Sequence, residues 1–292
     1  MQQFLAIVLN GVATGMIYAA FALALVLIWQ STRIVNFAQA PMAMITVLSA
    51  LWLIDRGVNY WVAFVGALVM GLILGALVER LVIRYVDQKS HINPVILTLG
   101  LFIVIHSVAA IIFHNDFRSF PAPLGVSGIA VGDMYIPMTW TDIFAIVIVL
   151  VVMGALRTLF LKTDIGLKMR ASAFNPEVAR LLGVRVSRTL TLGWALAAMV
   201  GSLAGLLIAS GGLVHPSYMD GVVIFGFVAA VLGGLDSPAG AVVGGLIVGL
   251  TLSFVSGYLG SGLVPIAALL VLVAVLLVKP SGLFSTTHER TV

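Results

Sequence analysis

The sequence predicts an all-α protein, a polytopic transmembrane helical bundle of about eight or nine spans, some of them short or broken. Composition is the first reason, because 61% of the 292 residues are hydrophobic and 9% are charged, whereas a soluble chain carries about 25% charged residues. The second is a series of apolar runs of about 20 residues, the length that crosses about 30 Å of hydrocarbon. The third is the gathering of basic residues into a few segments between those runs.

Nine apolar runs are the candidate spans of a single transmembrane domain over residues 1–292. They are 4–29, 37–54, 60–83, 93–113, 141–161, 189–211, 222–234, 240–257 and 263–279. The first run lacks a basic leader and is longer than the apolar core of a signal peptide, so we expect a retained span. Between 222–234 and 240–257 lie several helix breakers and Asp236. Two short, tilted spans joined by a tight turn are favoured there over a helix broken at membrane depth.

Lysine and arginine in short loops predict the orientation. The segments assigned to the cytoplasm are 30–36, 84–92, 157–188 and the tail after residue 279. This assignment leaves only Arg56 and Arg118 outside. The loop 114–140 then faces outward, and its prolines and glycines indicate irregular structure with a short strand or a re-entrant piece. The C-terminus is expected in the cytoplasm, and an odd number of spans places the N-terminus outside.

The segment 157–188 is the one long polar interruption, and it holds seven of the fifteen Lys and Arg residues. Within it, Asn175 and Pro176 have the character of an N-cap and a first helical position. Gly183 is placed to end that helix, which predicts a helix over 176–182.

This helix is expected to be amphipathic. Val178, Leu181 and Leu182 fall on one face, and Glu177 and Arg180 flank it. A helix of this length is unstable alone in water, so we expect it to dock on something. Its own protein, anionic lipid and a partner protein are all possible on composition alone.

Uncharged polar residues occur in the first two spans. Asn10, Thr14 and Tyr18 are spaced by four and share a helix face, and Asn36 and Gln39 follow in the next segment. Such residues either line a translocation pathway or form hydrogen bonds between helices worth about 1 kcal/mol or less each. Both interpretations stay open.

Glycines are expected where helices touch, because small residues let backbones approach closely. They are Gly66, Gly71 and Gly75 in the third span, Gly201 and Gly205 in the sixth, and Gly240, Gly244, Gly245 and Gly249 in the eighth.

The chemistry of the sequence argues against an enzyme. No G-x-x-x-x-G-K-[ST] loop is present to hold a nucleotide phosphate, and no cysteine, metal-binding motif or catalytic constellation occurs. His106 lies within the fourth span, where a hydrogen bond between helices is favoured over a proton relay. Glu79 and the aspartates lie in loops or at span ends, which disfavours an ion-coupled carrier. Nothing indicates nucleic-acid binding.

Three groups of residues carry a resemblance to a known family. They are GMIYAAFAL at 15–23 with RIVNFA at 33–38, GLKMRA at 166–171 with NPEVARLLGV at 175–184, and VLGGLDSPAGAVVGG at 231–245. These groups resemble, in the same order, the opening, the cytoplasmic loop and the late glycine-rich segment of the LivH-type permeases of branched-chain amino acid ABC transporters. Two departures are Gln39-Ala40 in place of His-Gly and Asp236 in place of a common glycine.

The resemblance implies a multi-pass permease of the bacterial inner membrane that moves branched-chain or related amino acids. Related permeases move urea, short amides or aromatic acids, and an ion-coupled secondary carrier or channel is the alternative from another class. The coupling helix that enters a groove of the ATPase would be formed by Asn175, Pro176, Glu177, Val178, Ala179, Arg180, Leu181, Leu182 and Gly183.

The family pattern also implies partners. They are a second permease subunit, LivM-like or a copy of this chain, two cytoplasmic ATPase subunits, a periplasmic substrate-binding protein on the side of loop 114–140, and membrane lipid. ATP would be used by the partner subunits, and this chain would bind no cofactor itself.

Overall fold

The structure is a computed structural model, and it describes residues 2–85, 92–131 and 134–284. The helices are α1 Gln2–Thr32, α2 Gln39–Ile54, α3 Tyr60–Leu81, η1 Ile83–Tyr85, α4 Ile92–Phe113, α5 Trp140–Lys162, α6 Asp164–Phe174, α7 Pro176–Leu181, α8 Val186–Ala209, α9 Asp220–Gly233, α10 Pro238–Tyr258, η2 Ser261–Leu263 and α11 Val264–Val278. In the described part of the chain, seven helices are long and apolar enough to cross a membrane. The predicted helical membrane bundle is confirmed.

Two of the nine predicted spans are short helices, whereas α11, with 15 residues, reaches 18 together with η2. α2 has 16 residues and α9 has 14. At 1.5 Å per residue they rise about 24 Å and 21 Å, less than the roughly 30 Å of a hydrocarbon core. By contrast α10 has 21 residues. The expectation that the runs 222–234 and 240–257 are both short spans is therefore wrong for the second run. Its glycines face other helices, and this close packing favours a full-length helix over a break.

The connection between α9 and α10 is the expected tight turn. Gly234 has φ +98°, a left-handed conformation that favours glycine. Ser237 then caps α10, because its Oγ accepts a hydrogen bond from the Gly240 amide at 3.0 Å, and Pro238 occupies the first helical position.

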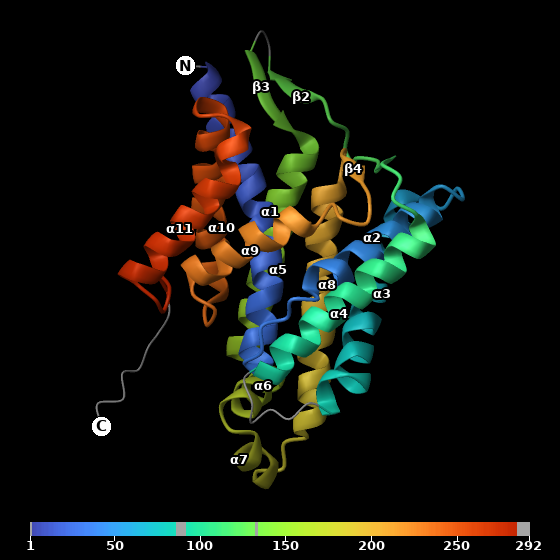
Figure 1. The fold of residues 1–292 in the computed structure, drawn as a ribbon, viewed down its shortest axis with the longest axis vertical. Helices are drawn as coiled ribbons and strands as arrows, with labels where there is room; N and C mark the ends of the chain where they lie inside the picture. The colour runs from blue at the N-terminus through green and yellow to red at the C-terminus, as the bar shows by residue number, and fades with distance from the viewer. Residues whose placement is uncertain (1, 86–91, 132–133, 285–292) are drawn as a thin grey trace.

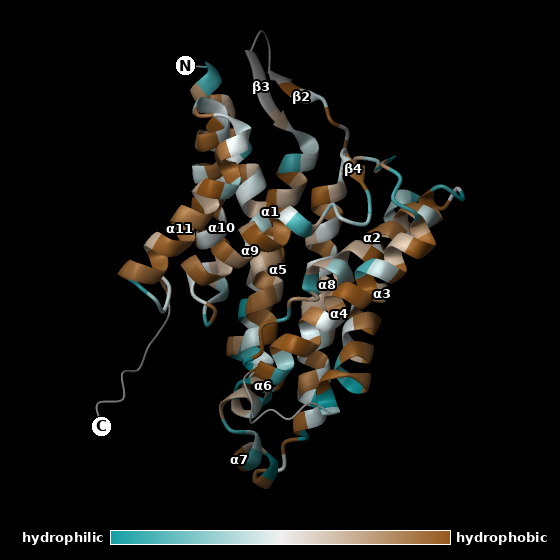
Figure 2. Ribbon diagram, in the orientation of Figure 1, coloured by the Kyte–Doolittle hydropathy of each residue, from teal (hydrophilic) through white to brown (hydrophobic). Residues whose placement is uncertain are grey.

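The core is built around α1, α2 and α8, which are largely buried along their length, whereas α4 and α11 are mostly exposed. Figure 1 shows α1 running the length of the bundle, with α10 and α11 beside it in the picture and α2, α3 and α4 on the other side. The brown colour of α4 and α11 in Figure 2 shows that their residues are mostly hydrophobic, and many of their large apolar side chains are exposed. Such surfaces suit contact with lipid or with another membrane subunit.

Glycines make the closest helix contacts, as predicted. A Cβ on Gly249 would overlap the backbone of Gly15, so α10 lies directly against α1. A Cβ on Gly75 would overlap the Trp194 carbonyl, which brings α3 equally close to α8. Gly66 is the exception, because the nearest atom that a Cβ there would meet is in the Leu53 side chain, at 4.0 Å.

Short strands occupy the loop between α4 and α5, where a strand was expected. β2 Gly128–Val131 and β3 Met134–Thr139 form an antiparallel hairpin, and β1 Arg118–Ser119 pairs with β4 Leu213–Val214. An Arg118–Asp55 ion pair joins this loop to the α2–α3 turn. The N-terminus and the hairpin lie at one end of the molecule, and α6 and α7 lie at the other (Figure 1). This arrangement agrees with an N-terminus outside and the long basic loop inside.

Candidate functional site

The polar loop after α5 folds into two helices. Thr163 caps α6, because its Oγ1 accepts a hydrogen bond from the Gly166 amide at 3.1 Å. Asp164 supplies a negative charge to the first turn. α6 was not predicted as a helix, although Thr163 followed by Asp164 is the signal that marks its start.

α7 follows directly and matches the predicted helix to within one residue at its end. The Asn175 Oδ1 accepts hydrogen bonds from the amides of Glu177 and Val178, each at 3.1 Å. Pro176 is the first helical residue. Gly183, with φ +82°, ends the turn in a conformation that favours glycine. The two ends of α7 are therefore fixed by its own sequence.

The apolar face of α7 points away from the rest of the chain. Leu181 is 87% exposed and Leu182 is 77% exposed, while Ala179 is buried on the opposite side. The flanking Glu177 and Arg180 are also exposed. In Figure 1, α7 is the element farthest from the N-terminal end of the bundle. The alternative in which the leucines pack on their own protein is therefore wrong for this structure.

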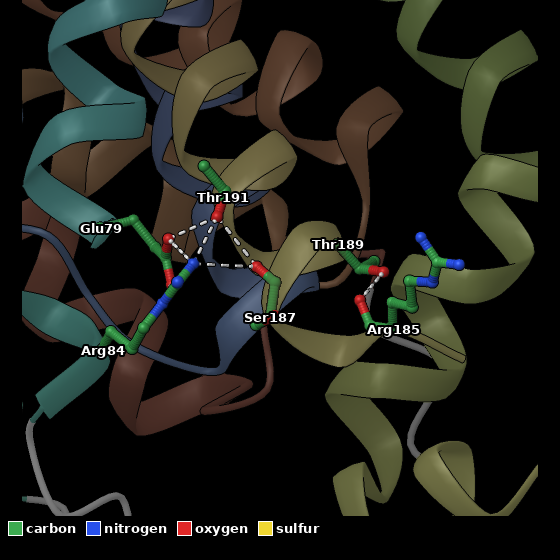
Figure 3. A network of polar contacts seen from close by, with 6 residues as sticks. All are labelled: Glu79, Arg84, Arg185, Ser187, Thr189 and Thr191. Atoms are coloured by element: carbon green, nitrogen blue, oxygen red, sulfur yellow. Dashed lines mark hydrogen bonds and ion pairs between the residues drawn. The ribbon is translucent and has the colours of Figure 1, made fainter. Parts of the chain in front are cut away.

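A buried polar network joins the start of α8 to the end of α3 (Figure 3). Glu79 is 1% exposed, and its Oε2 accepts hydrogen bonds from Arg84 Nη2 at 2.9 Å and from Thr191 Oγ1 at 2.5 Å. Arg84 Nη2 also lies 2.9 Å from Thr191 Oγ1 and 3.4 Å from the Ser187 carbonyl oxygen. α8 begins a few residues after α7. This network therefore connects the chain that follows α7 to both α8 and α3.

The same close-up shows how the first turn of α8 is closed. Thr189 Oγ1 donates a hydrogen bond to the Arg185 carbonyl at 3.2 Å, on the far side of α8 from Glu79 (Figure 3). The Glu79 network was not predicted from the sequence, where Glu79 was placed only at a span end. The sequence did contain a signal for it, because Arg84 lies five residues after Glu79 and carries the opposite charge.

The polar face of α1 meets the last spans. Asn10 is exposed, and its Nδ2 lies 3.4 Å from Ser253 Oγ on α10. Tyr18 is half-buried, with its ring centroid 5.3 Å from that of Phe225 on α9. Thr14 lies between them and is also half-buried. The three residues thus follow a line along α1 that is partly open and faces α9 and α10.

Asn36 and Gln39 are buried and hydrogen-bonded within the protein. Asn36 Nδ2 donates to Gln39 Oε1 at 3.1 Å, and Gln39 Nε2 donates to the Ala197 carbonyl at 2.9 Å. Gly201 makes room for Gln39, because a Cβ there would overlap its amide. These contacts match the second interpretation given above, in which the polar residues form hydrogen bonds within the bundle and do not line a pathway. A pathway role for the two amides stays a prediction.

A second polar cluster lies on the side of β1 and β4. His106 Nε2 is 3.1 Å from Ser217 Oγ and 3.9 Å from Asp220 Oδ2. The Ser217 amide donates to His215 Nδ1 at 3.2 Å. The favoured interpretation of His106 was a hydrogen bond between helices; it does bond to a distant part of the chain, but Ser217 lies in the turn before α9 and not in a helix. Its partners were not predicted, because they lie far along the chain, 111 positions away in the case of Ser217.

Asp236 links the α9–α10 turn to the end of α1. It forms an ion pair with Arg33, accepts a hydrogen bond from Trp29 Nε1 at 3.2 Å, and its carbonyl accepts one from Gln30 Nε2 at 2.7 Å. Arg33 itself has φ +58°, an uncommon conformation for a residue with a side chain. The residue that departs from the family pattern thus connects two elements at the end of the bundle that carries α6.

Comparisons with known proteins agree with this arrangement. The family model described as "Branched-chain amino acid transport system / permease component" matches residues 7–279. The chain is 28% identical to the high-affinity branched-chain amino acid transport system permease protein LivH of Escherichia coli (strain K12), over 99% of this chain and 98% of that protein. It is 25% identical to the corresponding permease protein BraD of Pseudomonas aeruginosa, over 99% and 98%.

A relative from a third organism gives the same result. The probable branched-chain amino acid transport permease protein LivH of Methanocaldococcus jannaschii is 27% identical, over 92% of this chain and 89% of that protein. The family model covers nearly the whole bundle, from the first turns of α1 to the end of α11. The chain therefore belongs to the family of permease components of branched-chain amino acid transport systems.

Proposed function

We propose that this chain is the inner-membrane permease subunit of an ABC importer for branched-chain or related amino acids. Transport would be driven by separate ATPase subunits that dock on α7. The observation that carries the proposal is the exposed apolar face of α7. Leu181 and Leu182 are exposed at the end of the molecule opposite the N-terminus, where a soluble partner can reach them. Large exposed apolar side chains grouped on one element indicate a protein interaction site.

The local structure of α7 favours docking. Asn175 and Gly183 fix its two ends, so little conformational freedom remains to be lost when a partner binds. Burying a leucine side chain stabilises a complex by about 1.5–3 kcal/mol. Glu177 and Arg180 flank the leucines and provide charges for a polar rim around an apolar centre.

The contacts of α8 support a route from α7 to the spans. The chain passes from α7 into α8 within a few residues, and α8 is largely buried in the bundle. The Glu79–Arg84–Thr191 network fastens the same end of α8 to α3. A displacement of α7 by closing ATPase subunits would therefore move α8 and α3 together, and α8 packs against α1.

The translocation pathway is proposed along the polar face of α1. Asn10, Thr14 and Tyr18 are at least partly accessible, and Tyr18 lies beside the short helix α9. A second permease subunit, a LivM-like chain or a copy of this one, would complete the pathway, and a periplasmic binding protein would deliver the cargo. The relatives are named for branched-chain amino acids, which supports the same cargo class here.

The docking face is tested with Leu181→Asp in cells that express the whole transporter. The change removes an apolar contact and places a charge in the proposed interface, so the amount of ATPase co-purifying with the permease is expected to fall at least about tenfold. Uptake of labelled leucine is expected to fall with it. Leu213→Asp is the matched control, because Leu213 is also an exposed leucine but lies in β4, at the other side of the bundle.

Membrane insertion of each variant is measured separately, by the amount of full-length chain in washed membranes. If Leu181→Asp inserts normally and keeps both ATPase and uptake, docking through this face is wrong. If the purified chain transports in liposomes without ATP, the ion-coupled carrier or channel replaces the importer. The cargo is tested independently, by asking which loaded binding protein stimulates ATP hydrolysis by the isolated complex.

A further inference from the structure

A cavity of about 630 Å³ opens where the ends of α1 and α5 meet α6 and the α9–α10 turn. It lies at the end of the bundle that carries the basic loop. Its polar lining is dominated by arginine, with Arg33 from the end of α1, Arg157 from α5 and Arg170 from α6. Among residues 2–85, 92–131 and 134–284, the one acid in the lining is Asp236.

The cavity has an excess of positive charge. Arg33 and Asp236 form an ion pair and largely neutralise each other. Neither Arg157 nor Arg170 forms an ion pair with an acid anywhere in residues 2–85, 92–131 and 134–284. Two exposed guanidinium groups that line one cavity from different helices give it a positive potential. The arrangement therefore selects for a negatively charged group.

The depth of Arg157 points to the membrane surface. It lies five residues before the last residue of α5, Lys162, which corresponds to about 7.5 Å along the helix. An arginine near the end of a membrane helix extends its guanidinium towards the interface, where lipid phosphates lie. Arg170, on α6 just outside the span, approaches the cavity from the aqueous side.

Apart from Gln30 and Ser237, the rest of the lining is apolar. Met153, Phe160 and Leu161 of α5 contribute one wall, and Phe174 of α6 contributes another. A small water-soluble anion gains little from contact with apolar side chains, whereas a phospholipid has a phosphate for the arginines and hydrocarbon chains for the apolar walls. We propose that this cavity binds the phosphate of an anionic phospholipid from the cytoplasmic leaflet, held between Arg157 and Arg170. Arginine suits this role because its planar fork donates two hydrogen bonds to one phosphate.

This proposal goes beyond the transport function and does not depend on it, because lipid binding can be measured without ATPase or cargo. The full-length chain is delipidated in detergent and titrated with phosphatidylglycerol or with phosphatidylcholine of the same acyl chains, and bound lipid is counted by native mass spectrometry. Phosphatidylglycerol is expected to remain bound where phosphatidylcholine does not. Arg157→Gln and Arg170→Gln are each expected to weaken phosphatidylglycerol binding about fivefold, and the double variant about 25-fold.

Arg80→Gln is the matched control, because Arg80 is an exposed arginine near the same end of the bundle, on α3 and outside the cavity. It is expected to bind phosphatidylglycerol as the wild type does. If Arg80→Gln weakens binding as much as Arg157→Gln, the effect is general surface charge and the site is wrong. Equal retention of both lipids by the wild type overturns the proposal as well.

Two further arms separate the remaining explanations. An excess of inorganic phosphate that displaces phosphatidylglycerol would show a site for free phosphate, and that result overturns the lipid assignment. If the double glutamine variant is not monodisperse, Arg157→Lys with Arg170→Lys is measured instead. The lysines keep the charge but lose the bidentate fork, so binding weaker than wild type supports the proposal, and unchanged binding contradicts phosphate coordination by these two residues.

Discussion

Replacing Arg84 by leucine tests how firmly the base of α7 is tied to the bundle. The change removes the positive partner of Glu79, whose side chain is 1% exposed. Thr191 still donates to the carboxylate, but the negative charge is left without a compensating cation. Glu79 lies near the end of α3, away from bulk water, so the loss cannot be made good by full hydration.

The expected cost follows from the geometry. Removing one partner of a buried ion pair costs about 3–5 kcal/mol. The Arg84 side chain is 34% exposed, so part of its interaction is already screened by solvent, and the lower value of about 3 kcal/mol applies. For a chain of this length, each kcal/mol lowers the thermal midpoint by about 2 °C, so Arg84→Leu is expected to lower it by about 6 °C.

The assay is thermal unfolding of the purified chain in detergent, run as a double-mutant cycle with Glu79→Leu. The double variant Glu79→Leu with Arg84→Leu is expected to recover most of the loss, because no unpaired charge remains and Thr191 keeps its bond to the Ser187 carbonyl. Arg80→Leu is the control, since Arg80 lies on the same helix as Glu79 and is exposed. A double variant as unstable as Arg84→Leu, or a control shifted as far, would refute the reasoning.

Two more changes test packing and capping. Gly249→Ala drives a methyl group into the backbone of Gly15 and is expected to cost about 1–3 kcal/mol in thermal stability, whereas Gly100→Ala, on α4 with open space around it, is expected to cost nothing. Equal losses from the two would mean that α1 and α10 are not closely packed. Asn175→Ala removes the cap of α7, at about 1 kcal/mol of helix stability, and is expected to reduce ATPase co-purification, while Asn175→Asp keeps the acceptor and most of the binding. Unchanged co-purification by Asn175→Ala would contradict a role for a preformed α7.

Local signals explain what the sequence could predict. The bounds of α7 depend on Asn175, Pro176 and Gly183, all within nine positions, and the structure confirms them. The spacing of the apolar residues predicts that they share a face of α7, but not that this face is exposed. α6 was missed because its apolar residues alternate with small or polar ones between 165 and 172 and follow no helical period, so only the short capping signal at Thr163 marks it.

Contacts between distant segments could not be predicted in the same way. Thr191 lies 112 positions from Glu79, and nothing near either residue specifies the other as its partner. The three arginines of the cytoplasmic cavity also meet only because α1, α5 and α6 converge. The glycines showed which helices pack closely but not which helix each one faces, and Gly66 faces none closely.

The contact of α1 with α10 has a consequence for biosynthesis. Asn10 and Ser253, which meet across this contact, are 243 positions apart in the chain. At about 5–20 residues per second, α10 leaves the ribosome on the order of 10 to 50 s after α1. During that time α1 has no α10 to pack against, and its glycine-lined side must rest against lipid or the insertion machinery. The contact between α1 and α10 at the centre of the bundle can therefore form only near the end of synthesis.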